Sequence, residues 1–526
     1  MVEMLLWRHL NRLLELLGLF RLRSRVSLGF FCIMVPGALS CGSSCGLGEL
    51  HTPKKPVGST LRADLVHPSD GAQESTPVPA REVILNATIV QARRNAQVAV
   101  LGPKVELVPD PRPLPLDGIL PGGAQDPNGQ LGFFVPLEPR EQAGRLAAFE
   151  EALDALEKGE REQPLRLAFY GASGVAADLW TGYIRHYLQS RFGSAGPGIV
   201  SAAKPTRWYR HQELLVESSK HWTRHAYRRK QVDDEFEPAY FGVMGQAMSA
   251  SSKRAWTRIK PGARARTAPA LAWYEVHYLK QKRGGQMRVR IDGKLVKKVS
   301  TSFGKEGAPG ELGVERIDLS PLPPGPHELR IELVGDGEVF LLGVVAETGT
   351  PGIVLDTLGV NSAKVENQKE WASELWEAHV QLRAPVLYAF AFGNNESAAE
   401  EIPLATFEAD FRAMLVRFER VLPHASCVVI SPGDFPIVDP EDQSLSPRPR
   451  QAQIIAIEER LSREFRCMFL DMQAVMGGAG GKARWVEAGL AQADHLHLTR
   501  RGYVLEGMAI ADALLWEYDH ARSGAE

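Results

Sequence analysis

Two short motifs in this 526-residue chain carry the side chains that acyl transfer requires. In the first, Gly171-Ala172-Ser173, a serine follows an apolar run and precedes a helix-compatible segment. In the second, Asp494-His495-Leu496-His497, a histidine stands three residues after an aspartate. A histidine can deprotonate a serine hydroxyl when a carboxylate orients its other ring nitrogen. Ser173 is therefore a candidate nucleophile, His497 its base and Asp494 the orienting acid.

Taken one at a time, these residues also have plain structural explanations. A serine on a strand-to-helix turn occurs in many α/β proteins that have no chemistry at that point. An aspartate before a helix is typical of a cap, and the histidine beside it is then a surface residue. Only the presence of both motifs favours the catalytic interpretation.

Two loops between the motifs offer donors for a developing oxyanion. Gly359 follows an apolar run, and its backbone N–H can face an alkoxide. Asn395, in Phe392-Gly393-Asn394-Asn395-Glu396, can add a side-chain N–H. Either loop alone is more typical of turn formation than of catalysis.

The elements that must position these residues alternate between apolar runs and helical patterns. We predict strands at 165–170, 353–358, 385–392, 427–431 and 467–471, with helices between them. Such alternation predicts an α/β fold with a parallel sheet covered on both faces. The candidate residues each lie just after a strand or just before a helix, so they would meet at the carboxyl edge of the sheet.

Residues 204–350 have a different character. Short alternating runs are separated by turn residues, and Asp292-Gly293 is a strong hairpin signal. We expect an antiparallel β-sandwich inserted into the α/β chain. Aromatic and cationic residues near its start are candidates for glycan binding. The same residues fit a solvated basic loop with aromatic side chains in the core at least as well. The candidates are Trp208, Tyr209, Trp222 and Arg224.

The N-terminal region resembles an export signal. Residues 1–41 combine a basic start, an uncharged apolar run and Cys41, which is the layout of a secretory or lipoprotein-type segment. Lipidation at Cys41, simple cleavage and an uncleaved membrane anchor all remain open. We expect 42–80 to be a flexible linker and 81–137 to be irregular or a small β element. The chain would then be exported, to the periplasm or cell envelope.

Composition excludes several classes of function. The net charge of −2 gives no global case for nucleic-acid binding. Five cysteines are too few for a disulfide framework. We expect Cys427 and Cys467 to be small buried side chains in strands, and a disulfide between them is left open. No histidine or cysteine cluster has metal-ligand spacing, so no metal is predicted.

The order Gly-x-Ser, Gly, Gly-x-Asn, Asp-x-x-His resembles the SGNH (GDSL-type) hydrolases. More narrowly, it is similar to secreted bacterial members that remove O-acetyl groups from peptidoglycan or other glycans and carry an inserted carbohydrate-binding-like β-sandwich. The resemblance runs from Leu165 to the C-terminus. It implies a flavodoxin-like hydrolase domain in two parts, 138–203 and 351–526, on either side of the insert.

Carried over by position, the resemblance makes Ser173 the nucleophile, His497 the base and Asp494 its orienter. The Ser173 N–H, Gly359 and Asn395 would form the oxyanion hole. It implies a serine esterase acting on an O-acetylated glycan without a metal or organic cofactor, or an O-acetyltransferase if a sugar hydroxyl replaces water. The family usually has aspartate where this chain has Ala172. That departure favours the alternative, a non-catalytic glycan-binding or envelope scaffold protein.

Overall fold

The computed structural model describes residues 80–103, 135–139, 144–207, 209–226, 240–262, 270–303 and 310–523. All of them belong to the second of the chain's two compact units, Thr76–Glu526. The predicted export segment, all but the last residue of the predicted linker, and Trp208 lie outside the described residues. Among the helices that the structure describes, none is both long and apolar enough to cross a membrane.

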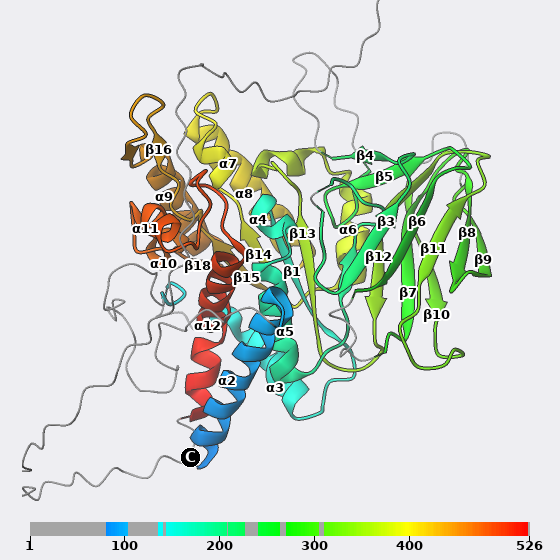
Figure 1. Cartoon of the computed structure of the whole chain (residues 1–526), viewed down its shortest axis with the longest axis horizontal. Coiled ribbons are helices and arrows are strands. Elements are labelled where there is room, and N and C mark those ends of the chain that lie inside the picture. Colours follow the sequence, from blue (N-terminus) through cyan, green and yellow to red (C-terminus); the bar gives the residue numbers. More distant parts are fainter. Residues whose placement is uncertain are drawn as a thin grey trace, which may run out of the picture. The chain divides into compact units, whose positions relative to one another are not determined.

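A parallel five-stranded sheet organises the α/β part, with the strand order β13-β1-β14-β15-β18 (Figure 1). Every neighbouring pair in this sheet runs parallel, which confirms the predicted α/β architecture. Gly171 at the end of β1 lies opposite both Gly359 of β13 and Ala391 of β14. The strands are β1 (Leu165–Gly171), β13 (Ile353–Gly359), β14 (Leu387–Ala391), β15 (Ser426–Ile430) and β18 (Met468–Leu470).

Helices cover both faces of this sheet, as the continuous apolar strands require. Leu165, Leu167 and Phe169 of β1 enter one hydrophobic core, and Ala168 and Tyr170 enter the other. The first core also takes side chains from α2 (Ala80–Leu101), α3 (Ala147–Glu157), α5 (Trp180–Phe192), α10 (Met472–Val475), α11 (Gly481–Glu487) and α12 (Arg500–Ser523). The second takes them from η3 (Val365–Glu370), α6 (Ser373–Arg383), α8 (Leu404–Val421) and α9 (Pro449–Glu464).

The insert forms two antiparallel sheets around a third core, as predicted. One sheet has the order β10-β7-β12-β5-β4, with β2 also paired to β12, and the other has the order β3-β6-β11-β8-β9 (Figure 1). Asp292 and Gly293 both have positive φ, of 50° and 80°, and they turn β8 into β9, which confirms the predicted hairpin. The strands are β2 (Gly198–Val200), β3 (Leu214–Ser218), β4 (Thr223–His225), β5 (Ala247–Ala250), β6 (Trp256–Pro261), β7 (Trp273–Lys280), β8 (Gln286–Ile291), β9 (Lys294–Ser300), β10 (Glu311–Asp318), β11 (Leu329–Leu333) and β12 (Val339–Glu347).

A buried ionic cluster joins the insert to the parallel sheet. Glu347, at the end of β12, accepts hydrogen bonds from Arg166 of β1 at 3.0 and 2.7 Å. Arg383 of α6 donates a hydrogen bond to the same carboxylate at 2.9 Å. It also donates two hydrogen bonds to the carboxylate of Asp356 in β13, at 2.9 and 3.0 Å. Asp356 in turn accepts the backbone N–H of Ile199 in β2. Because each charge has partners, the cluster can be buried without an uncompensated ion.

The structure corrects two predictions for the region before the sheet. Residues 80–101, expected to be irregular or a small β element, form helix α2, which packs on α5 and α12 (Figure 1). Its buried positions Ile89, Ala92, Ala96 and Val100 follow helical spacing, but two alanines make that pattern weak. The pattern of Leu146, Phe149, Leu153 and Leu156 predicts an amphipathic helix over 138–158. In the structure helix α3 begins only at Ala147, because Glu138 pairs with Phe469 through its backbone N–H and C=O.

Cys427 and Cys467 are buried, as expected, and the structure selects the disulfide that the sequence left open. Cys427 and Cys467 form a disulfide across a sequence separation of 40 residues. The sheet order explains the pairing, because Val428 of β15 lies directly opposite Met468 of β18. The sequence gives no sign of this, since it does not reveal which strands are neighbours.

Candidate active site

Ser173 is positioned by the close approach of helix α4 (Ser173–Ala176) to the strand ends beneath it. A Cβ at Gly171 would lie 2.6 Å from the carbonyl oxygen of Ala391, so only glycine fits where β1 turns into α4. The first hydrogen bond inside the helix joins the N–H of Ala176 to the carbonyl of Ala172. The backbone N–H groups of Ser173, Gly174 and Val175 therefore have no acceptor within the helix.

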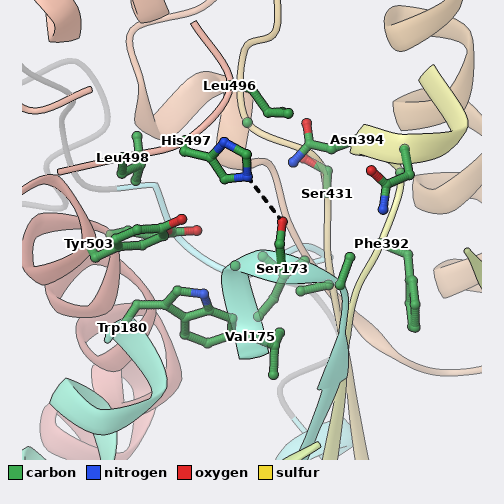
Figure 2. Close-up of a pocket in the computed structure, with 18 of the residues that line it drawn as sticks. Ser173, Val175, Trp180, Phe392, Asn394, Ser431, Leu496, His497, Leu498 and Tyr503 are labelled. Atoms are coloured by element: carbon green, nitrogen blue, oxygen red, sulfur yellow. Dashed lines mark hydrogen bonds between the residues drawn. The ribbon is translucent and has the colours of Figure 1, made fainter. Parts of the chain in front are cut away.

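His497 and Asp494 continue a line of hydrogen bonds that begins at the serine, and Figure 2 shows the contact between Ser173 and His497. The Oγ atom of Ser173 is 3.4 Å from Nε2 of His497, and Nδ1 of His497 is 2.8 Å from Oδ2 of Asp494. The serine comes from the end of β1 and the other two from the loop before α12. The sequence prediction thus selected three residues that the fold brings together across more than 320 positions, since Ser173 and His497 are 324 apart.

The aspartate also shapes the loop that carries the histidine. Its Oδ1 atom accepts the backbone N–H groups of Leu496 at 3.0 Å and His497 at 2.9 Å. Partial burial acts to raise the pKa of Asp494, but the hydrogen bonds from the His497 side chain and from these two N–H groups outweigh burial and lower it. Asp494 is therefore an anion at neutral pH, and an anion beside Nδ1 keeps the proton on that nitrogen and leaves Nε2 to accept one.

A cavity of about 70 Å³ opens above the serine. A single water occupies roughly 10 to 15 Å³ of such volume, so the cavity has room for a small acyl group. Figure 2 shows Trp180, Tyr503 and Phe392 around it, with Ser431 and Leu496 on the far side of the Ser173–His497 contact. Hydrophobic walls with a few polar groups are typical of a small-molecule site.

Both asparagines of the loop after β14 line this cavity. Asn395, the predicted donor, gives one Nδ2 hydrogen to the carbonyl of Ala363 at 2.8 Å, which leaves its second N–H for a ligand. Figure 2 shows the amide of Asn394 turned toward His497 and Ser173. Its Oδ1 atom is buried without a partner among the described residues. Asn394 was not predicted as a site residue, because the Gly-x-Asn pattern selects only Asn395.

Gly359, the other predicted donor, is not among the residues that line the cavity. It is the last residue of β13, and a Cβ there would collide with the backbone N of Ala176 in α4. The glycine therefore allows α4 to rest on the strand ends, which is a packing role. Its place in the structure offers no support for the expected oxyanion contact.

A buried charge network behind the serine was not foreseen. Asp178 follows α4 and accepts hydrogen bonds from Arg185, from Thr357 Oγ1 at 2.9 Å and from the backbone N–H of Gln212 at 2.6 Å. Arg185 also bonds Glu213 at 3.0 Å. Burial acts to raise the pKa of Asp178, but Arg185 and the other donors lower it far more. A lone aspartate after a short helix carries no sequence signal for such a network.

The predicted glycan-binding residues of the insert are mostly engaged within the protein. Tyr209 packs against the sandwich core, and its hydroxyl accepts the N–H of Ser201 at 2.8 Å. The Trp222 indole N–H bonds the carbonyl of Trp256 at 2.9 Å, and Arg224 bonds Gln246 at 3.2 Å. These contacts agree with the alternative of core aromatics. Glycan binding by them stays a prediction.

No family model matches the chain, and no curated protein matches it. Among solved structures, it is similar to a peptidoglycan O-acetylesterase with a TM-score of 0.58 and 19% identity, over 70% of this chain and 96% of that chain. A protein named GDSL-like lipase from Parabacteroides merdae matches with a TM-score of 0.24 and 19% identity, over 33% and 74% of the two chains. An acetyl xylan esterase matches with a TM-score of 0.24 and 14% identity, over 32% and 82%.

The fold assignment rests on the first of these similarities, which covers most of both chains. The chain has an SGNH-type hydrolase fold. In this SGNH fold the serine stands at the end of β1, and the aspartate and histidine stand before the last helix. Within the described residues, no group of three or more histidine, cysteine, aspartate or glutamate side chains could hold a metal ion.

This chain also buries a cation beneath the loop from Asp494 to His497, called the histidine loop. Lys482 is 3% exposed, and its ammonium donates to the carbonyl of Leu496 at 3.3 Å. Burial lowers the pKa of Lys482, and burial raises the pKa of the neighbouring Glu506, so the two groups depend on each other for charge. The pair supports the loop between Asp494 and His497 from the inside.

We predict that Lys482→Met lowers the free energy of unfolding by about 3 kcal/mol, because it leaves Glu506 buried without its cation. In the double variant with Glu506→Gln the loss should be smaller than the sum of the two single losses by about 1 to 2 kcal/mol. Urea unfolding of all four proteins measures both quantities, with the exposed Lys298→Met as a control that should change little. Strictly additive losses would contradict the coupling.

Proposed function

We propose that this protein is a serine esterase that removes O-acetyl groups from a cell-wall or extracellular polysaccharide. The observation that carries the proposal is the hydrogen-bonded line Ser173–His497–Asp494 at the mouth of a small cavity. Acyl transfer needs a nucleophile, a base and an orienting anion within hydrogen-bond reach, and free enzymes often hold them slightly loosely. The peptidoglycan O-acetylesterase among the similar structures supports the same class of reaction.

The reaction would proceed in two steps. Ser173 Oγ attacks the acetyl carbonyl carbon while His497 Nε2 takes its proton, and the sugar oxygen then leaves with that proton. Water next attacks the acetyl-serine, giving a proton to His497, which returns it to Ser173 as acetate departs. Asp494 stays ionised throughout and stabilises the imidazolium that forms in each step. A sugar hydroxyl in place of water would make the same site an O-acetyltransferase.

The negative charge of each tetrahedral intermediate needs donors on the cavity side. The backbone N–H of Ser173 is one candidate, since no acceptor within α4 uses it. An asparagine amide is the second candidate, and both Asn395 and Asn394 line the cavity. An exported location, which the N-terminal sequence favours, would bring the enzyme to its glycan substrate.

The alternative is a non-catalytic scaffold protein on the same fold, and Ala172 is the residue that favours it. Ala172 occupies the N-cap position of α4 and supplies no side-chain hydrogen bond to the helix. Ala172 nevertheless lines the cavity, so the small side chain in place of a carboxylate leaves the cavity open and does not obstruct it.

We predict that Ser173→Ala lowers the rate of p-nitrophenyl acetate hydrolysis by at least about a thousandfold, because the nucleophile is lost. Ser431→Ala is the matched control. Ser431 lines the same cavity, but its hydroxyl accepts the N–H of Met472, so its loss should change the rate only severalfold. Equal rates for wild type and Ser173→Ala would overturn the esterase proposal.

The two asparagines can be separated in the same assay. The variant that removes the oxyanion donor should lower kcat by roughly 10²- to 10³-fold with little change in KM. We expect Asn395→Ala to do so and Asn394→Ala to have a weaker effect. The reverse order would assign the donor to Asn394 and contradict the position chosen from the Gly-x-Asn pattern.

Ala172→Asp tests the departure from the family pattern. An aspartate at the N-cap can accept a backbone N–H of Gly174 or Val175 and stiffen the turn that carries Ser173. We expect a severalfold rise in kcat and a gain in stability of about 1 kcal/mol. Ala172→Asn, which can cap without a charge, is the control. A fall in kcat with both variants would show that this site works with alanine.

A further inference from the structure

A second cavity, of about 380 Å³, lies where the start of the insert meets the start of α12. Four cationic side chains line it, Lys204, Arg207, Arg210 and Arg500, and no carboxylate does. Neither Lys204 nor Arg210 takes part in an ion pair within the part of the chain that the structure describes. A concave surface of one sign raises the local concentration of ions of the other sign.

Two acidic residues that follow the cavity lining into the protein, within the described part of the chain, are already engaged by another cation. Asp178 and Glu213 are buried, and both are already paired with Arg185 at 2.8 and 3.0 Å. Burial and the positive charge of Arg210 together lower the pKa of Arg500, which places these two guanidinium groups within electrostatic reach of each other. Neither guanidinium group forms an ion pair with another described residue, and an anion that binds between two such cations stabilises both.

A buried histidine lies beside the same cavity. His211 Nδ1 accepts the backbone N–H groups of Glu213 and Leu214, at 3.3 and 3.2 Å, so its proton is on Nε2. The side chain is 2% exposed, and Nε2 has no hydrogen-bond partner among the described residues, with Asp178 Oδ2 at 3.9 Å. Its Nε2 atom is therefore turned toward the buried Asp178, so His211 belongs to the wall of the cavity and is not counted among its anion ligands.

One short stretch of chain and one hydrogen bond connect this cavity to the candidate active site. Arg500 stands three residues after His497, and Leu496 to Leu498 line the first cavity. On the other side, Gln212 lines the second cavity and donates its backbone N–H to Asp178, which follows the serine helix. The residues that line the two cavities are therefore joined through short stretches of the chain.

We propose that Lys204, Arg207, Arg210 and Arg500 form an anion subsite that holds carboxylate groups of an acidic polysaccharide, the chain whose acetyl ester reacts at Ser173. This inference rests on the proposed function and names the charge of its substrate. Arginine binds carboxylates through two parallel hydrogen bonds, which suits carboxylates spaced along a glycan. The exposed Leu215, at 43%, gives the cavity an apolar wall for a sugar face.

Binding can be measured without catalysis. The probe is peptide-free peptidoglycan glycan strands, which carry one carboxylate per disaccharide, titrated into the full chain with Ser173→Ala. Chitohexaose, with a similar backbone and no carboxylate, is the matched neutral probe. We expect the strands to bind at least about tenfold more tightly than chitohexaose at low salt, and the difference to shrink as ionic strength rises.

Charge-removing variants then locate the site. In the double variant Lys204→Gln and Arg210→Gln, two exposed residues whose loss should leave the fold intact, we expect the Kd for the strands to rise about tenfold. Arg254→Gln removes an exposed cation elsewhere on the insert and should leave the Kd unchanged. An unchanged Kd in the double variant, or equal binding of chitohexaose, would overturn the proposal.

Two further arms separate this proposal from its alternatives. Polyphosphate that binds more tightly than the strands and displaces them would show a general polyanion site and overturn the carboxylate assignment. Hydrolysis of p-nitrophenyl acetate should be the same in the double variant and the wild type, because that substrate has no carboxylate to hold. The two proposals can be told apart. If Ser173→Ala keeps full esterase activity while the strands still bind through these cations, the esterase proposal is overturned and the anion subsite is supported.

Discussion

The position of the serine depends on how closely a four-residue helix approaches the ends of two strands. Helix α4 lies on Gly171 of β1 and Gly359 of β13, which are opposite each other in the sheet, and a Cβ at either glycine would collide with its surroundings. Close packing of this kind has few alternative arrangements. The serine at the start of α4 is thereby held at the carboxyl edge of the sheet, where α/β folds place their ligands.

Buried charges connect this packing to the rest of the protein. Asp178, two residues after α4, is tied to β13 through Thr357 and to the start of the insert through Gln212. Glu347, Arg166 and Arg383 join the other end of the insert to β1 and α6. Removing one member of such a cluster leaves an uncompensated charge, which costs about 3 to 5 kcal/mol. The insert is thus fastened at both of its ends to the strands that carry the site.

Periodicity was enough to predict the parallel sheet and the antiparallel insert of the described part, but not the elements before the sheet. Apolar runs alternating with helical patterns gave the parallel sheet, and Asp292-Gly293 gave a hairpin of the insert, because both signals arise from local geometry. Helix α2 escaped because alanines at its buried positions, such as Ala92 and Ala96, do not mark an apolar face. The Cys427–Cys467 disulfide escaped because it depends on which strands are neighbours.

The candidate site shows the same division. Ser173, Asp494 and His497 could be selected because their residue types are chemically specific and the strand pattern brings their loops to one edge. The place of Gly359 could not be foreseen, since a glycine that donates an N–H and a glycine that admits a helix look identical in sequence. Asn394 and Lys482 are close to the histidine loop only through tertiary contacts, so no spacing rule finds them.

The absence of a carboxylate at position 172 must be weighed against these constraints. A capping aspartate contributes about 1 kcal/mol to the local turn, mainly by satisfying a backbone N–H at the helix start. The close contacts at Gly171 and Gly359 and the Asp178 network also hold α4 in place. These interactions are buried, and buried polar interactions are stronger than those in water. The serine is consequently oriented more by tertiary packing than by its own cap. Loss of the cap then affects how rigidly the N–H groups of α4 face the cavity, while the distance from Ser173 to His497 is set elsewhere.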